Sequence, residues 1–372
     1  MPAGVIERDE LAAWLRLIET PGSGRESGRR LLAAFGSPQA AIDASVAARR
    51  GVVGLGPATA LATPPDNFDA QLELTIAWLQ AGDATPRNII TLGDPTYPAA
   101  LLETADPPLL LYAQGRVEFL QAPMVAIVGS RNPTPQGKIN AHSFAKHLSQ
   151  AGLTVVSGLA AGIDGAAHEG ALEGSSGTVA VVGTGLDRVY PSRHLALAHR
   201  IAANGLLLSE YSLGTPPLAE NFPQRNRIIA GLARGTLVVE AALQSGSLIT
   251  ARLAAEAGRD VFALPGSIHA PQSRGCHALI KQGAKLVDTA QDILEDLRPG
   301  MNAAVAPTDA TTESAPIDPL LEALGHDPVT LEALVARTGW PAERLSAQLL
   351  ELELDGQVAR LPGQLFQRVS RG

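Results

Sequence analysis

The stretch MVAIVGS, residues 124–130, decides the fold of this chain. Its first five positions are all apolar, and it closes with the small residues Gly129 and Ser130. A strand with one face in water would alternate apolar and polar side chains, whereas a strand covered on both faces reads as a continuous apolar run. The stretch therefore predicts a buried strand of a parallel sheet, followed by a tight turn.

Runs of the same kind recur further along the chain. They are TVVSG at 154–158, TVAVVG at 178–183, GLLLSEY at 205–211, TLVVEA at 236–241 and DVFALPG at 260–266. Each run leads into a turn that contains Gly or Pro, and then into an Ala-rich stretch of about 10–15 residues that suits a helix. This alternation of strand and helix predicts an α/β domain built on a doubly wound parallel sheet.

The composition is that of a globular protein of two or three domains. Of the 372 residues, 45% are hydrophobic and only 4% aromatic, which suits helices packed closely on a sheet and disfavours a β-sandwich. Cys276 is the single cysteine, so an intrachain disulfide is excluded and a reducing compartment fits. No apolar run approaches the roughly 20 residues of a membrane span, and the first residues lack a signal-peptide core. We expect a cytoplasmic protein without membrane contact.

The charge is unevenly distributed. The whole chain has a net charge of −8, with 29 Lys and Arg against 37 Asp and Glu. Between residues 124 and 297 there are 14 Lys and Arg against 13 Asp and Glu, a net charge of +1. The excess acid thus lies in the flanking segments, and a polyanion partner would need a local basic patch on the sheet domain.

Residues 1–80 predict a small helical domain. A PGSG turn at 21–24 separates two short amphipathic segments, which is typical of a helix-hairpin-helix or of a small sterile-alpha-motif-like bundle. A helix-hairpin-helix turn holds a DNA phosphate on its backbone N–H groups, but glycine turns between short helices are common. Both interpretations stay open.

The C-terminal part predicts a linker and a winged-helix-like domain. Residues 298–316, RPGMNAAVAPTDATTESAP, have no apolar periodicity and predict a flexible linker. Residues 317–372 read as three helices followed by two short strands, the order of a winged helix. The third helix carries Glu343, Glu351, Glu353 and Asp355 against Arg344 alone. Such a helix repels phosphate, which favours a protein contact or a structural role over reading of a DNA groove.

The distinctive motifs fall at or near the carboxyl ends of predicted strands, where open parallel sheets bind ligands. FPQRNR at 222–227 stands between the fourth and fifth strands and supplies Arg225 and Arg227. The other motifs are Gly129-Ser130-Arg131, SGLAAGIDG at 157–165, GTGLD at 183–187 and SGS at 245–247. Small residues let backbone N–H groups approach an anion, and arginines add charge in a fork that suits phosphate. The motifs predict an anion site at one edge of the sheet.

A competing interpretation concerns the same arginines. Arg225 and Arg227 could form structural salt bridges with Asp164, Asp187 or Glu240. The two aspartates suit helix caps or arginine-orienting groups better than catalytic acids. If every arginine were neutralised in this way, an anion site would have no basis.

The sequence predicts no catalytic residue, no cofactor and no metal. The glycine spacing is not G-x-G-x-x-G, and seven residues separate Gly129 from Gly137 where a Walker A loop needs four. No histidine is paired with Cys or a carboxylate at metal-ligand spacing, and G-x-S-x-G is absent. His168, one turn past the predicted helix start at Asp164, is the histidine that most needs an explanation.

Taken together, these motifs resemble the DNA-processing protein A (DprA/Smf) family. In chain order they are the Gly129-Ser130-Arg131 turn, SGLAAGIDGAAHEGAL, GTGLDRVYP, SEY, NFPQRNRIIAGL, VVEAALQSGSLITARLAAEAGRDVFALPG and LIKQGAKLV. The resemblance covers about 90–297 strongly and the flanks loosely. It implies an extended Rossmann-like domain at 81–297, between the helical domain and the winged helix.

The resemblance also implies a function without catalysis. Members of this family bind single-stranded DNA, protect incoming strands during natural transformation and help load RecA onto DNA coated by single-strand-binding protein. They act as homodimers formed through the Rossmann domain. Arginines would meet successive phosphates, and an aromatic side chain would stack on or beside a base. The implied DNA-binding residues are Ser130, Arg131, Gly158, Gly162, Asp164, Phe222, Arg225, Asn226, Arg227, Ser245, Gly246 and Ser247.

Two alternatives belong to other classes. A nucleotide-binding or phosphoribohydrolase-like enzyme on a similar core would carry P-G-G-x-G-T-x-x-E, whereas the matching place, residues 240–251, reads EAALQSGSLITA. It has neither the double glycine after a proline nor the glutamate that ends the motif, which argues against this chemistry. A protein-interaction scaffold, with its arginines locked in ion pairs, is the other alternative.

Overall fold

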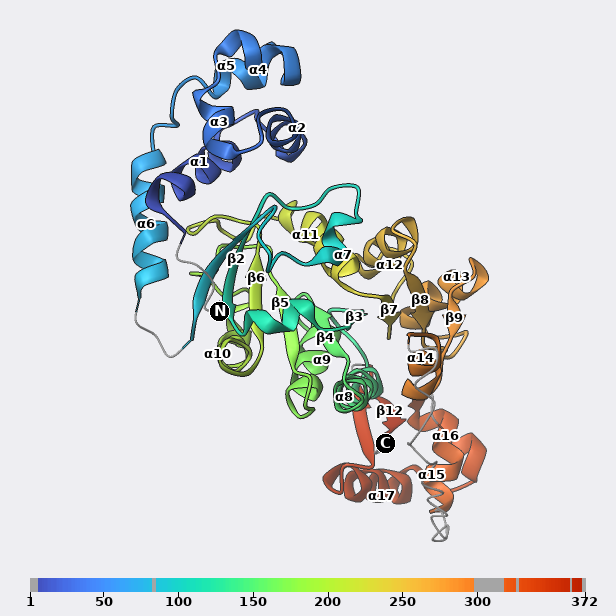
Figure 1. Cartoon of the computed structure of the whole chain (residues 1–372). Coiled ribbons are helices and arrows are strands. Elements are labelled where there is room, and N and C mark those ends of the chain that lie inside the picture. The colour runs from blue at the N-terminus through green and yellow to red at the C-terminus, as the bar shows by residue number, and fades with distance from the viewer. Residues whose placement is uncertain (1–5, 82–84, 298–317, 326–327, 362, 370–372) are drawn as a thin grey trace.

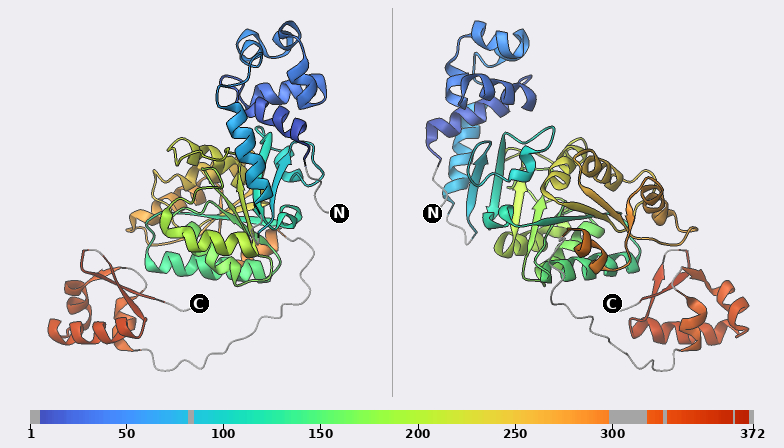
Figure 2. Two further views of the ribbon diagram at one scale, coloured as in Figure 1. Left: turned by 90° about the vertical axis from the view of Figure 1, so that its left-hand side faces the viewer. Right: turned by 45° about the vertical axis from the view of Figure 1, so that its right-hand side comes forward.

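The structure is a computed structural model that describes residues 6–81, 85–297, 318–325, 328–361 and 363–369. Along these residues the chain passes from a group of helices, through a large sheet with helices on both faces, to a small unit with its own sheet (Figure 1). Figure 2 shows the N-terminal helices and the C-terminal unit at different ends of the large sheet. Within the described residues no helix is both long and apolar enough to cross a bilayer. The predicted linker at 298–316 lies outside the described residues, and the predicted domain limits stay a prediction.

The N-terminal helices pack on one another and on the edge of the sheet. They are α1 (Arg8–Glu19), α2 (Arg25–Phe35), α3 (Pro38–Asp43), α4 (Val46–Val53), α5 (Leu55–Ala60) and α6 (Phe68–Gln80). Leu11 and Leu15, one turn apart on α1, are fully buried, as the 3.6-residue period requires. The ring of Trp78 on α6 makes an edge-to-face contact with the ring of Tyr112 on the sheet, with ring centroids 5.9 Å apart. The helices and this end of the sheet therefore share one core.

Nine strands form the large sheet, in the order β1-β2-β6-β5-β4-β3-β7-β8-β9. They are β1 (Arg87–Thr91), β2 (Leu110–Gly115), β3 (Met124–Val128), β4 (Thr154–Ser157), β5 (Thr178–Val181), β6 (Leu206–Ser209), β7 (Gly235–Val238), β8 (Asp260–Ala263) and β9 (Lys285–Leu286). From β6 to β9 neighbouring strands run parallel, while β2 pairs antiparallel with β1 and β6. The strand order reverses between β3 and β7, which makes this the topological switch point.

The structure confirms the six strands predicted from apolar runs, as β3 to β8. Each ends one to three residues earlier than predicted, because the small residues after the run turn away from the sheet as loops. The sequence prediction did not identify β1, β2 and β9. β9 is only two residues long. The segment between β1 and β2 lacks the helix of about 10–15 residues that follows each strand in the predicted pattern.

Helices cover both faces of the sheet, as the continuous apolar runs predicted. On β3, Val125 and Ile127 pack with α8, α9 and α14. Met124, Ala126 and Val128 pack on the opposite face with α11, α12 and α13. The bounds are α7 (Ala99–Leu102), α8 (Pro135–Gln150), α9 (Ile163–Leu172), α10 (Leu195–Asn204), α11 (Asn221–Leu232), α12 (Ser247–Glu256), α13 (Arg274–Lys281) and α14 (Ala290–Leu297), with short 3₁₀ helices η1 (Val117–Gln121), η2 (Ser192–His194) and η3 (Pro271–Ser273).

The C-terminal unit has the predicted winged-helix arrangement. Its elements are α15 (Pro319–Leu324), β10 (Val329–Thr330), α16 (Leu331–Thr338), α17 (Ala342–Leu354), β11 (Val358–Leu361) and β12 (Leu365–Arg368). Leu320, Leu334, Leu345 and Leu349 form its core. The single arginine of α17, Arg344, lies over the Trp340 ring at 4.2 Å. Whether this third helix avoids DNA stays a prediction.

Close packing of α8 on α9 gives a prediction about stability. A Cβ at Gly170 of α9 would overlap the backbone carbonyl of His142 on α8, and a backbone cannot swing aside. We expect Gly170→Ala to lower the free energy of unfolding by about 1–3 kcal/mol, measured by denaturant titration. Gly51→Ala is the control, since open space surrounds that position within α4, and alanine there should be neutral or slightly stabilising. Equal effects of the two variants would contradict the close contact.

Candidate functional site

The loop after β4 is organised by a buried carboxylate. Asp164, in the first turn of α9, accepts hydrogen bonds from the backbone N–H groups of Gly158 at 3.1 Å and Ala160 at 3.3 Å. Burial raises the pKa of this carboxyl, against the attraction of Arg225. These two amides are therefore used within the protein and do not hold an external anion, in contrast to the expectation for the small residues of this loop. Asp164 is therefore not the predicted helix cap: it lies within α9, the residue before that helix is Gly162, and no side chain caps the helix there.

Two histidines hold Leu159 in its unusual conformation. Leu159 has φ +57°, a left-handed backbone that non-glycine residues rarely adopt. Its N–H donates to His168 Nε2 at 3.2 Å, and its carbonyl contacts His194 Nδ1 at 3.0 Å. His168 Nδ1 lies 2.7 Å from Thr178 Oγ1, whose own proton goes to the Val155 carbonyl. His168 is therefore neutral with its proton on Nδ1, and burial lowers its pKa to about 3.

Arg225 places a buried positive charge next to this loop. Its side chain is on α11 and the residue is 3% exposed. The guanidinium packs against Gly158, where any Cβ would overlap it, and donates to the Val181 carbonyl at the end of β5. Among the described residues no carboxylate lies within ion-pair distance, and its Nε has no partner. Burial lowers the pKa of Arg225 to about 10, partly offset by Asp164, so the group stays charged at neutral pH.

The guanidinium of Arg225 lines a cavity of about 160 Å³ above β4 and β5. Arg131, from the turn after β3, has its guanidinium carbon 5.6 Å from the centroid of the Phe222 ring. Tyr190 lies on the same ring with centroids 5.5 Å apart. Residues that line the cavity are Arg131, Gly158, Ala160, Ala161, Val182, Gly183, Thr184, Tyr190, Pro191, Arg193, Phe222 and Arg225. Buried and exposed guanidinium groups thus meet aromatic rings around one opening, an arrangement that can hold an anion.

The structure brings together part of the predicted set. Arg131, Gly158, Phe222 and Arg225 line the cavity, while Asp164 supports it from beneath. The loop that carries Arg131 and the loop that carries Gly158 touch at Gly162, where a Cβ would lie 2.7 Å from Pro133 Cδ.

Ser130 also supports the junction of these loops. Its carbonyl accepts the Ile163 N–H at 3.1 Å, and its hydroxyl accepts the Asn132 N–H at 3.1 Å. Ser130 thereby fixes the start of the turn that carries Arg131.

The remaining predicted residues lie elsewhere. Asn226 turns toward the loop after β7, with its Nδ2 3.5 Å from the Gly246 carbonyl. In that loop the hydroxyl groups of Ser245 and Ser247 are 2.6 Å apart. Neither Asn226 nor the SGS turn lines the cavity, so these residues form a separate polar group beside it.

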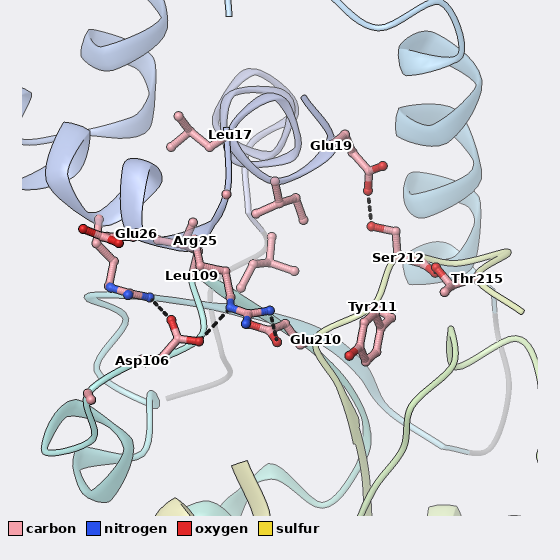
Figure 3. A pocket seen from close by; sticks show the side chains of 15 residues that line it. Leu17, Glu19, Arg25, Glu26, Asp106, Leu109, Glu210, Tyr211, Ser212 and Thr215 are labelled. Carbon is pink, nitrogen blue, oxygen red and sulfur yellow. Dashed lines mark hydrogen bonds and ion pairs between the residues drawn. The ribbon is translucent and has the colours of Figure 1, made fainter. Parts of the chain in front are cut away.

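Arg227 belongs to an ion-pair network between α2 and the sheet. It pairs with Glu210, which follows β6, and its Nε lies 3.0 Å from Asp106 Oδ2. Arg25 of α2 contacts the same two carboxylates, at 2.9 Å and 3.5 Å, and Arg29 pairs with Asp106. Figure 3 shows Arg25 between Asp106 and Glu210. These three residues line a cavity of about 1040 Å³.

The predicted convergence of Arg225 and Arg227 is thus not what the structure shows. Positions two residues apart on a helix do not share a face, and the side chains of these two arginines point to different sites. The ion-pair interpretation describes Arg227, but with Glu210 and Asp106 as partners instead of Asp164, Asp187 or Glu240. Burial would raise the pKa of Asp106, but the arginines outweigh it and keep that pKa below its ordinary value.

A carboxylate occupies the switch point of the sheet. Glu240, which follows β7, accepts the Thr134 N–H at 2.9 Å and the Thr134 hydroxyl at 2.6 Å. Thr134 is the residue that caps α8, and a helix start of this kind binds the phosphate of nucleotides in many doubly wound proteins. Gly137 of α8 also packs directly on the Glu240 carboxyl group. The protein's own negative charge therefore fills the position that a nucleotide phosphate would take.

Sequence reasoning missed Tyr190 and Arg193 as members of the site. Both belong to the segment GTGLDRVYPSRH, of which only the glycines and Asp187 were considered as site features. The available signal was an aromatic residue beside Pro191 in a loop at the carboxyl end of β5, in a chain where aromatic residues are scarce.

The fold and the cavity define an extended Rossmann-type protein with a cationic pocket over its parallel strands and a C-terminal winged helix. The family described as DNA recombination-mediator protein A matches residues 88–298, and the one described as DprA winged helix domain matches residues 304–364. Protein Smf of Escherichia coli is 40% identical over 359 residues, which cover 94% of each chain. DNA processing protein DprA of Streptococcus pneumoniae is 50% identical over 203 residues, 55% of this chain and 72% of that protein. The chain therefore belongs to the DNA recombination-mediator protein A (DprA/Smf) family.

Solved structures agree with this membership. DNA processing protein A of Streptococcus pneumoniae superposes with a TM-score of 0.67 at 38% identity, over 79% of this chain and 99% of that one. DNA processing protein A of Helicobacter pylori, whose structure concerns its single-stranded DNA binding mode, gives a TM-score of 0.52 at 34% identity, over 57% of this chain and 95% of that one.

The contact between Gly158 and Arg225 gives a prediction about anion binding. An alanine at 158 would push the guanidinium out of its place, and the cavity would lose its buried charge. Sulfate binds the native state and should therefore raise the unfolding temperature of the parent above its value in chloride of the same ionic strength. The increase should be smaller for Gly158→Ala. Gly56→Ala is the control, since open space surrounds that position. Because sulfate also stabilises proteins nonspecifically, the difference between variants is the readout, and identical responses would contradict the assignment.

Proposed function

We propose that this protein binds single-stranded DNA without cleaving it, protects incoming strands during natural transformation and recombination, and helps load RecA. The observation that carries the proposal is Arg225: a guanidinium that is 3% exposed and charged, without a carboxylate at ion-pair distance in the described part of the chain. A buried charge is costly to maintain unless it is paired. A phosphate that enters the cavity would supply the missing partner.

The surroundings of Arg225 favour a single strand over other polyanions. Phe222 and Tyr190 lie at the same opening as Arg131 and Arg225, and single-strand binders combine a cationic groove with aromatic rings on which bases stack. A cavity of about 160 Å³ accepts one small group at a time. In a duplex the bases are paired and stacked, and their faces are not available to these rings.

The relatives supply the finer parts of the proposal. The Helicobacter pylori protein is one for which single-stranded DNA binding has been structurally described, and we extend this ligand to the present chain. Roles with RecA and with DNA coated by single-strand-binding protein, which the family resemblance implies, are likewise part of the proposal. Within the proposal, Ser130, Gly158, Gly162 and Asp164 shape the site.

Phosphate contact falls to Arg131 and Arg225, and stacking to Phe222. Asn226 and the SGS turn at 245–247 form a polar group on which the strand would continue after it leaves the cavity. Arg227 is assigned an indirect role, because its charge is already matched by Glu210 and Asp106.

The absence of catalysis is also part of the proposal. Glu240 supports it by placing a carboxylate where a nucleotide phosphate would sit at the start of α8. A nucleotide bound as in the phosphoribohydrolases would place its phosphate next to this carboxylate. The Thr134 N–H would not be available to that phosphate, because it already donates to Glu240. Incubation with nucleoside monophosphates is accordingly expected to release no free base.

The proposal predicts opposite effects for the two arginines of α11. Arg225→Met removes an unpaired buried charge and keeps an apolar stem, so the free energy of unfolding should stay within about 1 kcal/mol of the parent or rise. Its affinity for a fluorescent oligo(dT) should fall at least about 10-fold, the cost of one charge-assisted contact. Affinity is measured by anisotropy at two salt concentrations, and stability by denaturant titration.

Arg227→Met is the matched control. It leaves Glu210 and Asp106 with fewer partners, so stability should fall while oligo(dT) affinity changes little. Equal loss of affinity in both variants would contradict the division of roles. An Arg225→Met protein that binds oligo(dT) like the parent would overturn the proposed DNA site and favour the scaffold interpretation.

We also propose a homodimer through the edge of the sheet at β9. Leu286 of β9 is 49% exposed and Leu243 is 59% exposed, and Leu243 lines a groove of about 510 Å³ beside α12 and α13. An open sheet edge with exposed leucines is a surface that soluble proteins usually cover. Two copies would present two DNA sites and gain affinity for long strands by avidity.

Light scattering tests the dimer. The parent should have the mass of two chains, and Leu286→Lys should have the mass of one chain with weaker binding of long oligonucleotides. Leu102→Lys, at a leucine of α7 that is 55% exposed, should leave the mass unchanged. A parent with the mass of one chain at micromolar concentration would refute the dimer.

A further inference from the structure

The segment from Tyr190 to His194 borders the cavity and carries an exposed tyrosine and an exposed arginine. Tyr190 is 50% exposed, and its ring lies at 36° to that of Phe222. Arg193 is exposed and lines the same cavity. In the described part of the chain no carboxylate lies within ion-pair distance of Arg193, in contrast to Arg188 of the same loop, which is 3.5 Å from Asp187.

Hydrogen bonds hold the end of this segment and the loop that precedes it. At its end, the His194 imidazole contacts the Leu159 carbonyl at 3.0 Å and packs on Gly165, where a Cβ would lie 2.9 Å from His194 Cε1. Before it, the Thr184 hydroxyl donates to the Arg188 carbonyl at 3.1 Å. The segment is therefore held in place before any ligand binds, which reduces the entropy lost on binding.

The position of Arg193 completes a set of three arginines around the cavity. Arg225 lies at its floor, while Arg131 and Arg193 come from separate loops after β3 and β5. Since successive phosphates of an extended strand are separated from one another, one buried charge neutralises only one of them. Arginines on either side of the cavity can take the neighbouring phosphates.

We propose that the segment Tyr190–His194 is a second strand-binding element, which rests on the proposed binding of single-stranded DNA. Tyr190 stacks on a base next to the one at Phe222, and Arg193 binds a phosphate adjacent to the one held by Arg225. His194 is a positioning residue, since it acts through the Leu159 carbonyl. Stacking on Tyr190 requires an unpaired base, so this residue contributes to the preference for single strands over duplex.

Substitution of Tyr190 tests the stacking role. Tyr190→Ala should weaken oligo(dT) binding about 10-fold, within the range for loss of one base–aromatic stack, and should narrow the preference for oligo(dT) over a duplex. Tyr190→Phe keeps the ring and should bind like the parent. In Tyr190→Trp, the added indole should show emission that oligo(dT) quenches beyond the change seen in the parent. If Tyr190→Ala binds like the parent, stacking at this position is refuted.

Substitution of Arg193 tests the phosphate role. Arg193→Ala should reduce the slope of log K against log[salt] by about 0.7, the value for one phosphate contact on a single strand. Arg188→Ala is the control, because Arg188 is an exposed arginine of the same loop that does not line the cavity, and its slope should not change. Equal slopes for Arg193→Ala and the parent would refute the contact.

These variants separate the two proposals. If Arg225→Met loses oligo(dT) affinity while Tyr190→Ala and Arg193→Ala keep it, the second strand-binding element is wrong and the proposed function stands. If none of the three loses affinity, the proposed DNA site itself fails. Tyr190 and Arg193 are exposed, so their replacement should leave thermal unfolding unchanged, and a loss of binding then reports the contact itself.

Discussion

The contact between the Arg225 guanidinium and Gly158 is the constraint on which the rest of the site depends. Only a residue without a side chain at 158 leaves room for the charge under the loop. Asp164 stands close enough to attract Arg225, yet its Oδ2 accepts the N–H groups of both Gly158 and Ala160, and the carboxylate forms no ion pair with the guanidinium. A direct ion pair would satisfy the arginine and close the cavity. The observed arrangement holds the charge in place without neutralising it, which is the kind of local conflict that marks functional sites.

Helix α11 joins this site to the rest of the molecule through different faces. Ile228 and Ile229 bury themselves in the core of the sheet, Arg225 points to the cavity, and Arg227 pairs with carboxylates that also bind Arg25 of α2. A shift of α11 would therefore move Arg225 at the cavity and Arg227 in the ion-pair network together. The network around Arg227 connects the N-terminal helices to α11, the helix that carries the buried charge of Arg225. Arg227 itself does not line the cavity at Arg225.

How much of this the sequence could predict depends on whether a feature is local. The strands from β3 to β8 were predictable because burial on both faces leaves a continuous apolar run. Arg131 was predictable because it follows a strand end, and Phe222 and Arg225 were predictable because they stand in the FPQRNR motif between two predicted strands. The role of Arg227 was not, since its partners Asp106 and Glu210 lie on other elements and meet it only through tertiary packing. The amides of the glycine loop were misjudged for the same reason: whether an N–H faces out or toward Asp164 is decided by the fold.

The location of the cavity follows from what Glu240 does at the switch point. In a doubly wound sheet the start of the first crossover helix is the position best suited to a phosphate, and here Glu240 fills it through Thr134. Positive charge has instead gathered over β4 and β5, at an opening whose arginines come from separate loops. A nucleotide ends at its phosphates and benefits from an enclosed pocket, whereas a polymer must enter and leave on both sides. An open rim with one buried charge at its floor meets that requirement, and the closed switch point removes the competing small ligand.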